Sequence, residues 1–326
     1  MPLDPALQAM LAQLESLHLP AMHEGTPEAA RRAIRRLTVD LRQPDAVVAV
    51  GAVRDLTIDG DDGPLAARVY RPVGGATGKP TILMLHGGGF VVGDLDTHDN
   101  QCRWVCREVD AVVVSVDYRR APDDPFPAAV EDALAGARWV ADHLDELGGH
   151  PGRFAVAGDS AGGNLAAVVA QAWRDEVVAG RPPLAAQLLI YPAVDLQDAG
   201  AERYPSRVEN ADGYFLSSAD MRWFGWHYAG EVADRRDPRL SPIFGELAGL
   251  PPAVVVTAEF DPLRDEGEAY AAAMADAGVE VTLRRFDGLI HGFFGLAAAS
   301  PACESAVRAT CRLLRETLAA EPATVS

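Results

Sequence analysis

Six short apolar runs, separated by stretches with helical spacing, constrain the fold of this 326-residue chain more than any other feature of its sequence. The runs at 112–116 and 253–257 each contain three successive valines with no polar residue between them. Such continuous runs are typical of strands that are buried on both faces, as in parallel sheets covered by helices. The sequence therefore predicts an α/β fold with a mostly parallel central sheet, with strands at 81–85, 112–116, 153–157, 186–190, 253–257 and 279–283.

Three segments lie outside this alternation of strands and helices. Residues 5–18 and 27–41 carry apolar side chains at helical spacing and predict two amphipathic helices. Residues 52–71 predict a β-hairpin around the turn-rich segment 59–64. Residues 195–245 are rich in Asp, Arg and aromatic side chains, have no strand signal, and are interpreted as an insertion.

Charge and cysteine content exclude several classes of protein. The 47 acidic and 29 basic residues give a formal net charge of −18, so we expect no binding to nucleic acid. No apolar run approaches the ~18–20 residues of a membrane helix, and no secretory signal pattern opens the sequence. Four cysteines without a CxxC pair fit a reducing compartment. We therefore expect a cytoplasmic protein that does not bind a membrane.

The strongest local signal is the G-x-S-x-G pattern at 158–162, which follows a buried-strand pattern and precedes a helical stretch. A nucleophile on a sharp strand-to-helix turn brings the residues two before and two after it close together, so both positions favour glycine. Ser160 is the one serine with this flanking. The alternative is an ordinary strand-to-helix turn without a chemical role.

A serine hydroxyl needs a base, and in a strand–turn–helix architecture the chain order is Ser, acid, His. Two histidines, His227 and His291, follow Ser160. His291 lies in a glycine-flanked segment, expected as a loop after the strand at 279–283, which can bring an imidazole to the carboxyl edge of the sheet. His227 lies among aromatic residues of the insertion, so we prefer His291 as the base.

Asp261 is the best-placed acid, because it follows the buried run 253–257 at a bend marked by a proline. Functional groups in such folds lie beyond the carboxyl ends of strands. Asp265 and Asp287 are rivals, but Asp265 is expected to begin the next helix and Asp287 is only four residues from His291.

A glycine-rich segment, His-Gly-Gly-Gly-Phe at 86–90, ends the run at 81–85. Successive glycines expose backbone N–H groups, which can stabilise the oxyanion of a tetrahedral intermediate together with the N–H of Ala161. A phosphate-binding loop is disfavoured, because no Lys-Ser/Thr pair follows and Val92 occupies the place of a required glycine. The Asp-rich turn at 59–62 lacks the Glu of a calcium loop, so we expect neither a metal nor a cofactor.

Five motifs occur in order along the chain: HGGGF at 86–90, DYRRAPDDPFPAA at 117–129, GDSAGGN at 158–164, DPLRDEG at 261–267 and HGF at 291–293. With these motifs the chain resembles the hormone-sensitive-lipase-like family (family IV) of bacterial esterases, which has the α/β-hydrolase fold. The resemblance covers about residues 46–320, and one motif, Tyr-Arg-Arg-Ala-Pro-Asp at 118–123, departs from the family's usual Tyr-Arg-Leu-Ala-Pro-Glu.

The resemblance implies roles for individual residues and a division of the chain. It implies a catalytic core at 46–194 and 246–326, a helical cap at 1–45 and 195–245, short-to-medium acyl esters as substrates, and dimers that often form through a sheet edge. His86 would be structural, with a hydrogen bond inside its own loop. The implied machinery is Ser160 as nucleophile, Asp261 and His291 as its partners, and Gly88, Gly89 and Ala161 as oxyanion donors.

Aromatic residues of the insertion are candidates for the substrate pocket. Trp223, Phe224 and Trp226, with Tyr228, lie close together in a segment without strand signal, and Phe90 adjoins the glycine loop. The equally weighted alternative is that they form the ordinary core of a small helical cap.

We therefore predict a carboxylic-ester hydrolase that acts on a small-molecule ester. A peptidase or amidase with the same triad, and a non-catalytic small-molecule-binding relative, are the alternatives. Chemistry that needs a carboxylate nucleophile is excluded, because Ser160 occupies that position.

Overall fold

The structure is a computed structural model of the chain that describes residues 1–18, 20–197, 203–230, 232 and 234–320. Its eight strands form one sheet in the order β1-β2-β4-β3-β5-β6-β7-β8. Within this order, the neighbouring strands β4-β3-β5-β6-β7-β8 all pair in parallel, whereas β2 pairs antiparallel with both β1 and β4. The strands are β1 (Ala52–Gly60), β2 (Gly63–Arg71), β3 (Lys79–Leu85), β4 (Val112–Val116), β5 (Gly149–Asp159), β6 (Ala186–Ile190), β7 (Ala253–Phe260) and β8 (Val281–Ile290). The predicted α/β class, hairpin and six further strands are thus confirmed.

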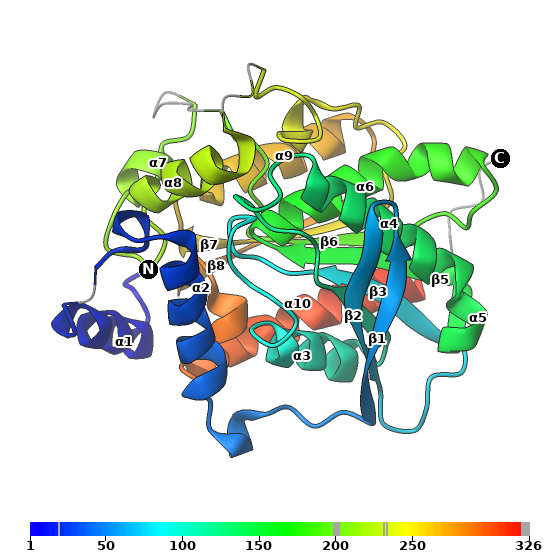
Figure 1. Cartoon of the computed structure of the whole chain (residues 1–326), viewed down its shortest axis with the longest axis horizontal. Coiled ribbons are helices and arrows are strands. Elements are labelled where there is room, and N and C mark those ends of the chain that lie inside the picture. The colour runs from blue at the N-terminus through cyan, green and yellow to red at the C-terminus, as the bar shows by residue number, and fades with distance from the viewer. Residues whose placement is uncertain (19, 198–202, 231, 233, 321–326) are drawn as a thin grey trace.

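Helices cover both faces of this sheet (Figure 1). The side chains of β4 show why: Val112 and Val114 point into one apolar cluster and Val113 into the other, and all three are fully buried. One cluster includes α4 (Ala128–Asp142), α5 (Leu144–Leu147), α6 (Ala161–Val178) and α9 (Arg264–Asp276); the other includes α3 (Asp99–Val109) and α10 (Pro301–Ala319). All four cysteines lie buried in α3 and α10 and are unpaired.

The last strand is longer than the sequence pattern predicts. A loop was expected from about residue 288, but β8 continues to Ile290. Gly288, with φ 74°, lies where the pairing of β7 with β8 is irregular, between Ala258↔Phe286 and Phe260↔Ile290. The Gly288 N–H donates to Glu259 Oε2 at 2.7 Å. The glycine therefore marks a bulge inside a strand, and His291 follows the strand directly.

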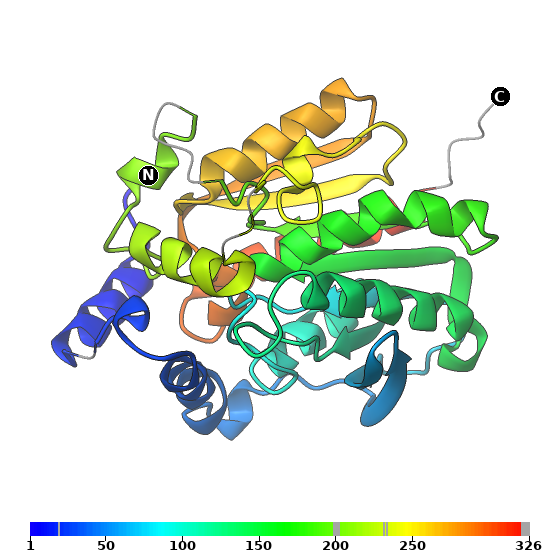
Figure 2. The ribbon, with the colours of Figure 1, turned by 45° about the horizontal axis from the view of Figure 1, so that its top comes forward.

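The N-terminal helices and the insertion lie next to each other on one side of the molecule (Figures 1 and 2). The N-terminal segment forms α1 (Pro5–Ser16), η1 (Met22–Glu24) and α2 (Pro27–Arg35), which continues into the π-turn η2 (Arg36–Asp40), followed by η3 (Pro44–Ala46). The insertion forms α7 (Ser206–Glu209), α8 (Ser218–Ala229) and η4 (Pro242–Phe244), and no strand occurs among its described residues. The remaining short helix is η5 (Phe293–Leu296).

A hydrogen-bonded contact joins these two segments. Both the backbone N–H and the Nδ1 of His23, in η1, lie within hydrogen-bond distance of Asp220 Oδ1 in α8, at 3.1 and 2.9 Å. Residues 19, 198–202, 231 and 233, which the expected cap includes, and 321–326 of the expected core lie outside the described residues. Within the described ranges, every helix is too short or too polar to cross a membrane.

Candidate active site

Ser160 lies on the sharp turn between β5 and α6, with φ 56° and ψ −117°. The two flanking glycines are required sterically. A Cβ on Gly158 would come 2.1 Å from the carbonyl oxygen of Gly162, and a Cβ on Gly162 would come 2.0 Å from the carbonyl oxygen of Leu85. Backbone atoms cannot yield to such contacts. The predicted close approach of the two glycine positions is confirmed at Gly158, whereas Gly162 is required because it lies against the carbonyl oxygen of Leu85 at the end of β3.

Asp261, His291 and Ser160 form a continuous hydrogen-bonded chain. His291 Nδ1 lies 2.8 Å from Asp261 Oδ2, and His291 Nε2 lies 3.0 Å from Ser160 Oγ. Asp261 is fully buried, and its Oδ1 accepts a hydrogen bond from the Leu263 N–H at 2.8 Å. An ionised carboxylate only accepts hydrogen bonds, so Nδ1 carries the imidazole proton and Nε2 is left as the acceptor for the Ser160 hydroxyl.

The rival residues lie elsewhere. The His227 ring packs against Trp223 with 4.5 Å between centroids. Asp265 accepts a hydrogen bond from the Ser206 N–H at 2.7 Å, and Asp287 is exposed on β8. The structure therefore brings together the three residues that chain order and strand ends indicated.

Gly88 and Gly89 follow β3 and line the same cavity as Ser160 and Ala161. They have φ 119° and 58°, where L side chains are strained. Among the described residues, neither glycine N–H donates a hydrogen bond within the protein. Ala161 is the first residue of α6, so its N–H has no partner inside the helix. The arrangement thus offers three backbone donors close to the serine.

Buried polar contacts fix the glycine loop. The Gly87 N–H donates to Asp159 Oδ1 at 2.9 Å, and His86 Nδ1 lies 2.8 Å from the Gly87 carbonyl oxygen. The Tyr118 hydroxyl donates to the His86 carbonyl oxygen at 2.6 Å, and the two rings stack. Burial lowers the pKa of His86 well below its ordinary value, so the imidazole is neutral. The expected structural hydrogen bond of His86 is present, whereas the anchoring role of Asp159 was not predicted.

A cavity of about 1130 Å³ opens onto Ser160. Three of the predicted pocket residues, Phe90, Phe224 and Trp226, line it, and Trp223 does not. Trp223 lies on α8 with its ring against His227 and the apolar core. A Cβ on Gly89 would come 2.2 Å from Phe224 Cγ, so this ring lies directly over the glycine loop. Trp226 is 58% exposed at the rim. No group of three or more metal-binding side chains occurs in the described ranges.

The sequence placed residues 1–45 in a cap over the pocket but named none of the residues of α2 that line it. The helix lines the cavity with small and aliphatic side chains: Ala29, Ala30, Ala33, Ile34 and, in η2, Leu37. Arg31 holds α2 against the glycine-loop region, because it donates to the carbonyl oxygens of Val91 and Ala121 at 2.8 and 2.9 Å. Helical spacing was visible in the sequence, but nothing local indicated which surface the apolar face would cover.

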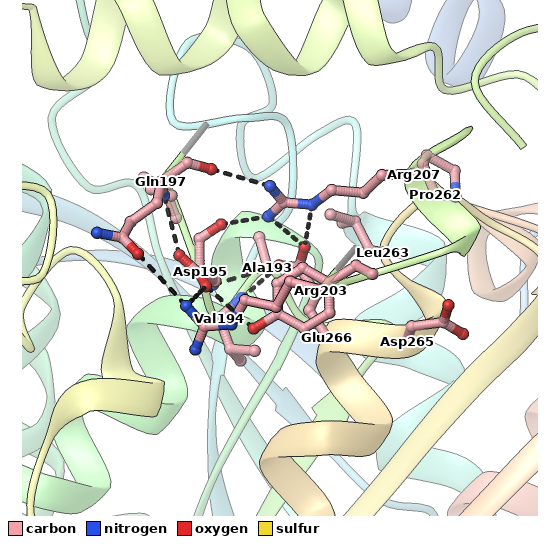
Figure 3. Close-up of polar contacts among 12 residues, drawn as sticks. Ala193, Val194, Asp195, Gln197, Arg203, Arg207, Pro262, Leu263, Asp265 and Glu266 are labelled. Carbon is pink, nitrogen blue, oxygen red and sulfur yellow. Dashed lines mark hydrogen bonds and ion pairs between the residues drawn. The ribbon is translucent and has the colours of Figure 1, made fainter. Parts of the chain in front are cut away.

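A buried ionic cluster forms another part of the wall (Figure 3). Arg207 in α7 donates to Glu266 Oε2 through Nη2 at 2.6 Å and to the Gln197 carbonyl oxygen through Nη1 at 2.8 Å. Glu266 Oε1 accepts the N–H groups of Val194 and Asp195 at 2.9 and 3.3 Å. Burial raises the pKa of Glu266 to about 7, although Arg207 opposes the shift.

The same helix, α7, contacts the turn that carries Asp261. Ser206 Oγ donates to the Pro262 carbonyl oxygen at 2.9 Å, and Asn210 Nδ2 donates to the Asp261 carbonyl oxygen at 3.2 Å. The Ser206 N–H donates to Asp265, as described above. The insertion is therefore docked on the segment that positions the acid.

Comparisons with known proteins agree with this geometry. A family model described as alpha/beta hydrolase fold matches residues 82–295. The carboxylic ester hydrolase LipN of Mycobacterium tuberculosis is 45% identical over 90% of this chain and 77% of its own length. An ethyl acetate hydrolase of Pseudomonas putida is 37% identical over 90% of this chain and 92% of its own length. The solved structure of a hyperthermophilic esterase from Pyrobaculum calidifontis matches with a TM-score of 0.91 at 43% identity, covering 98% of this chain and all of the other.

Proposed function

Because this chain belongs to the alpha/beta hydrolase fold family and is a carboxylic ester hydrolase, we propose that it cleaves esters through an acyl-enzyme formed on Ser160. One observation supports this most directly: Ser160 Oγ, His291 and Asp261 are joined by hydrogen bonds of 3.0 and 2.8 Å. Because His291 Nδ1 donates to Asp261, its Nε2 is free to accept the proton of the Ser160 hydroxyl.

The first half of the reaction acylates the serine. His291 Nε2 takes the hydroxyl proton as Ser160 Oγ attacks the ester carbonyl carbon. The carbonyl oxygen becomes an oxyanion, which the N–H groups of Gly88, Gly89 and Ala161 stabilise. The tetrahedral intermediate then breaks its bond to the alcohol oxygen. That oxygen leaves with the proton from His291, and the acyl group stays on Ser160.

The second half releases the acid. A water molecule attacks the acyl carbon while His291 takes one of its protons, and the oxyanion forms again at the same donors. The bond to Ser160 Oγ breaks, and the serine regains its proton from His291. Asp261 keeps the imidazole in the required tautomer and stabilises the imidazolium that forms in both halves.

We propose esters of short-to-medium acyl chains as substrates. The relative named ethyl acetate hydrolase supports this, as does the cavity of about 1130 Å³, which can hold both arms of such an ester. We also propose that residues 46–194 and 246–326 act as the catalytic core and 1–45 and 195–245 as a cap. The cavity-lining residues of α2, α7 and α8 support that division.

Two finer proposals follow from other features. A cytoplasmic location is supported by the four unpaired, buried cysteines. A homodimer through a sheet edge is supported by the position of β8 at the end of the sheet.

Replacing the nucleophile tests the mechanism. Ser160→Ala is expected to abolish hydrolysis of 4-nitrophenyl butanoate while the thermal unfolding midpoint changes little, because the elbow glycines remain.

The kcat/KM of the native protein is expected to fall on acidification from pH 8 to pH 5, because a protonated imidazole cannot act as a base. Turnover retained by the alanine variant, or a rate that is flat over this pH range, would refute the assignment. A parallel series of aminoacyl anilides distinguishes an esterase from a peptidase.

A further inference from the structure

We propose that Gln101 is a specificity-determining residue, which binds a neutral hydroxyl group on one arm of the ester. This inference rests on the proposed function. Gln101 lies in the first turn of α3 and lines the cavity, where the cavity extends between α3 and η5. Thr97, His98, Asp159, Gly295 and Leu296 line the same cavity.

The amide of Gln101 has no hydrogen-bond partner among the residues that the structure describes. The residue is only 8% exposed, and its Oε1 is buried without a hydrogen bond within the described ranges. No other hydrogen bond of this side chain occurs there either. A primary amide has two donor hydrogens and one acceptor oxygen, and buried polar groups are almost always paired. An unpaired amide in the wall of a substrate cavity therefore points to a ligand group.

Its polar neighbours already have partners. Thr97 Oγ1 donates to the Asp94 carbonyl oxygen at 2.9 Å, and His98 Nδ1 lies 3.1 Å from Thr97 Oγ1. His98 Nε2 faces Asp159 Oδ1 at 3.6 Å, and that oxygen accepts the Gly87 N–H. Among these polar side chains, Gln101 is thus the one that is left to bind substrate.

The amide of Gln101 lies against Gly295 in η5. A Cβ on Gly295 would come 3.1 Å from Gln101 Nε2, which is tighter than ordinary contact. A side chain at this position would therefore press on the amide. Gly295 has no positive φ, so its absence of a side chain is not needed for the backbone conformation.

The chemistry of the amide favours an uncharged hydrogen-bonding group. Gln101 carries no charge, so it offers a substituent hydrogen bonds but no ion pair. Acidic and basic side chains both line the cavity, Asp159 and Asp195 as well as Arg207, Arg222 and Arg235. A hydroxyl can donate to Oε1 or accept from Nε2, whichever way the amide is turned. The hydroxyl can belong to the acyl arm or to the alcohol arm of the ester, and two substrate pairs separate these cases.

The test compares isosteric esters that differ by hydroxyl against methyl. The acyl pair is methyl 3-hydroxybutanoate and methyl 3-methylbutanoate; the alcohol pair is 2-hydroxyethyl butanoate and propyl butanoate. For each pair, the ratio of kcat/KM values is measured by pH-stat for the native protein and for Gln101→Leu. We expect the substitution to lower the hydroxyl-to-methyl ratio about tenfold in one pair, because the apolar wall can no longer pair the hydroxyl.

Two further variants make the result decisive. Gly295→Ala crowds the amide and is expected to lower the same ratio, which tests the inference even if Gln101→Leu does not fold. Gln197→Leu replaces another cavity-lining glutamine, in the insertion, and is expected to leave the ratio unchanged. The inference is overturned if Gln101→Leu keeps the hydroxyl-to-methyl ratio of both pairs within twofold of the native value. If Gln101→Leu does not fold, the same result for Gly295→Ala overturns the inference. The proposed function is tested separately: it holds if the native protein hydrolyses all four esters and Ser160→Ala hydrolyses none of them.

Discussion

Gly89 is sterically restricted by the aromatic ring that covers the glycine loop. Its φ is 58°, and an added Cβ would come 2.2 Å from the ring of Phe224. Gly89→Ala must therefore shift either the loop or the ring, which moves an N–H away from the oxyanion. We expect kcat to fall by about 10²–10³, the usual effect of losing one such donor. Steady-state kinetics with 4-nitrophenyl butanoate measure this loss.

Matched variants separate geometry from folding. Gly249 also has a positive φ, of 73°, but an added Cβ there meets nothing within 4 Å. Gly249→Ala is expected to cost about 1 kcal/mol of stability and to leave kcat unchanged. If the ring is the obstacle, the double variant Gly89→Ala with Phe224→Ala recovers part of the lost rate. A fully active Gly89→Ala protein would contradict the assigned donor role.

The residues proposed for catalysis could be predicted because each carries a local signal. Ser160 has glycine at fixed spacing, Asp261 follows a buried strand, and His291 satisfies the chain order. Gln101 carries no such signal. Its environment depends on η5 and the end of β5 meeting the start of α3, and these contacts join segments that are far apart in the sequence.

At the scale of elements, the contact between α7 and α9 has a predictable pH dependence. Burial raises the pKa of Glu266 to about 7, above its ordinary value of 4.5, so the native state binds this proton more tightly than the unfolded chain. The free energy of unfolding therefore falls as pH rises from about 4.5 to 7. We expect the free energy of unfolding of the native protein, relative to that of Glu266→Gln, to fall by up to about 3 kcal/mol over this range. Urea unfolding at several pH values measures it.

Glu176 provides the control for this measurement. Burial alone would raise its pKa, but hydrogen bonds and charge from Arg138 and Arg181 lower it below 4.5. The carboxylate is therefore ionised in both states between pH 5 and 8. The difference in free energy of unfolding between the native protein and Glu176→Gln should therefore not change with pH over that window. An equally flat difference for Glu266→Gln would show that Arg207 keeps Glu266 ionised throughout.

Element boundaries were less predictable than element types. The strand at β8 was expected to end near residue 283, because Gly288 and Gly292 are typical of a loop. In the structure Gly288 forms a bulge, and its neighbours Leu289 and Ile290 are buried in the strand. Sequence pattern alone does not distinguish a glycine in a bulge from one in a loop, since both accept positive φ.

At the scale of the whole molecule, the net charge of −18 predicts how rates respond to salt. A neutral ester gains nothing from the field of the protein, so its kcat/KM should change less than twofold between 20 and 200 mM NaCl. An anionic ester of similar size is repelled, and screening should raise its kcat/KM over the same range. Initial rates with ethyl butanoate and monoethyl succinate compare the two cases. A steep salt dependence for the neutral ester would contradict the expectation.

The contact between His23 and Asp220 bears on how such enzymes can be recombined. Two parts of the cavity wall come from the first forty residues and from the middle of the chain, and this hydrogen bond is one of the places where these segments meet. A chimera that borrows only the middle segment from a relative would replace the part of the chain that supplies the acceptor of His23 and place foreign side chains opposite α2. The unit to exchange when grafting a new substrate range is therefore the pair of segments, transferred together.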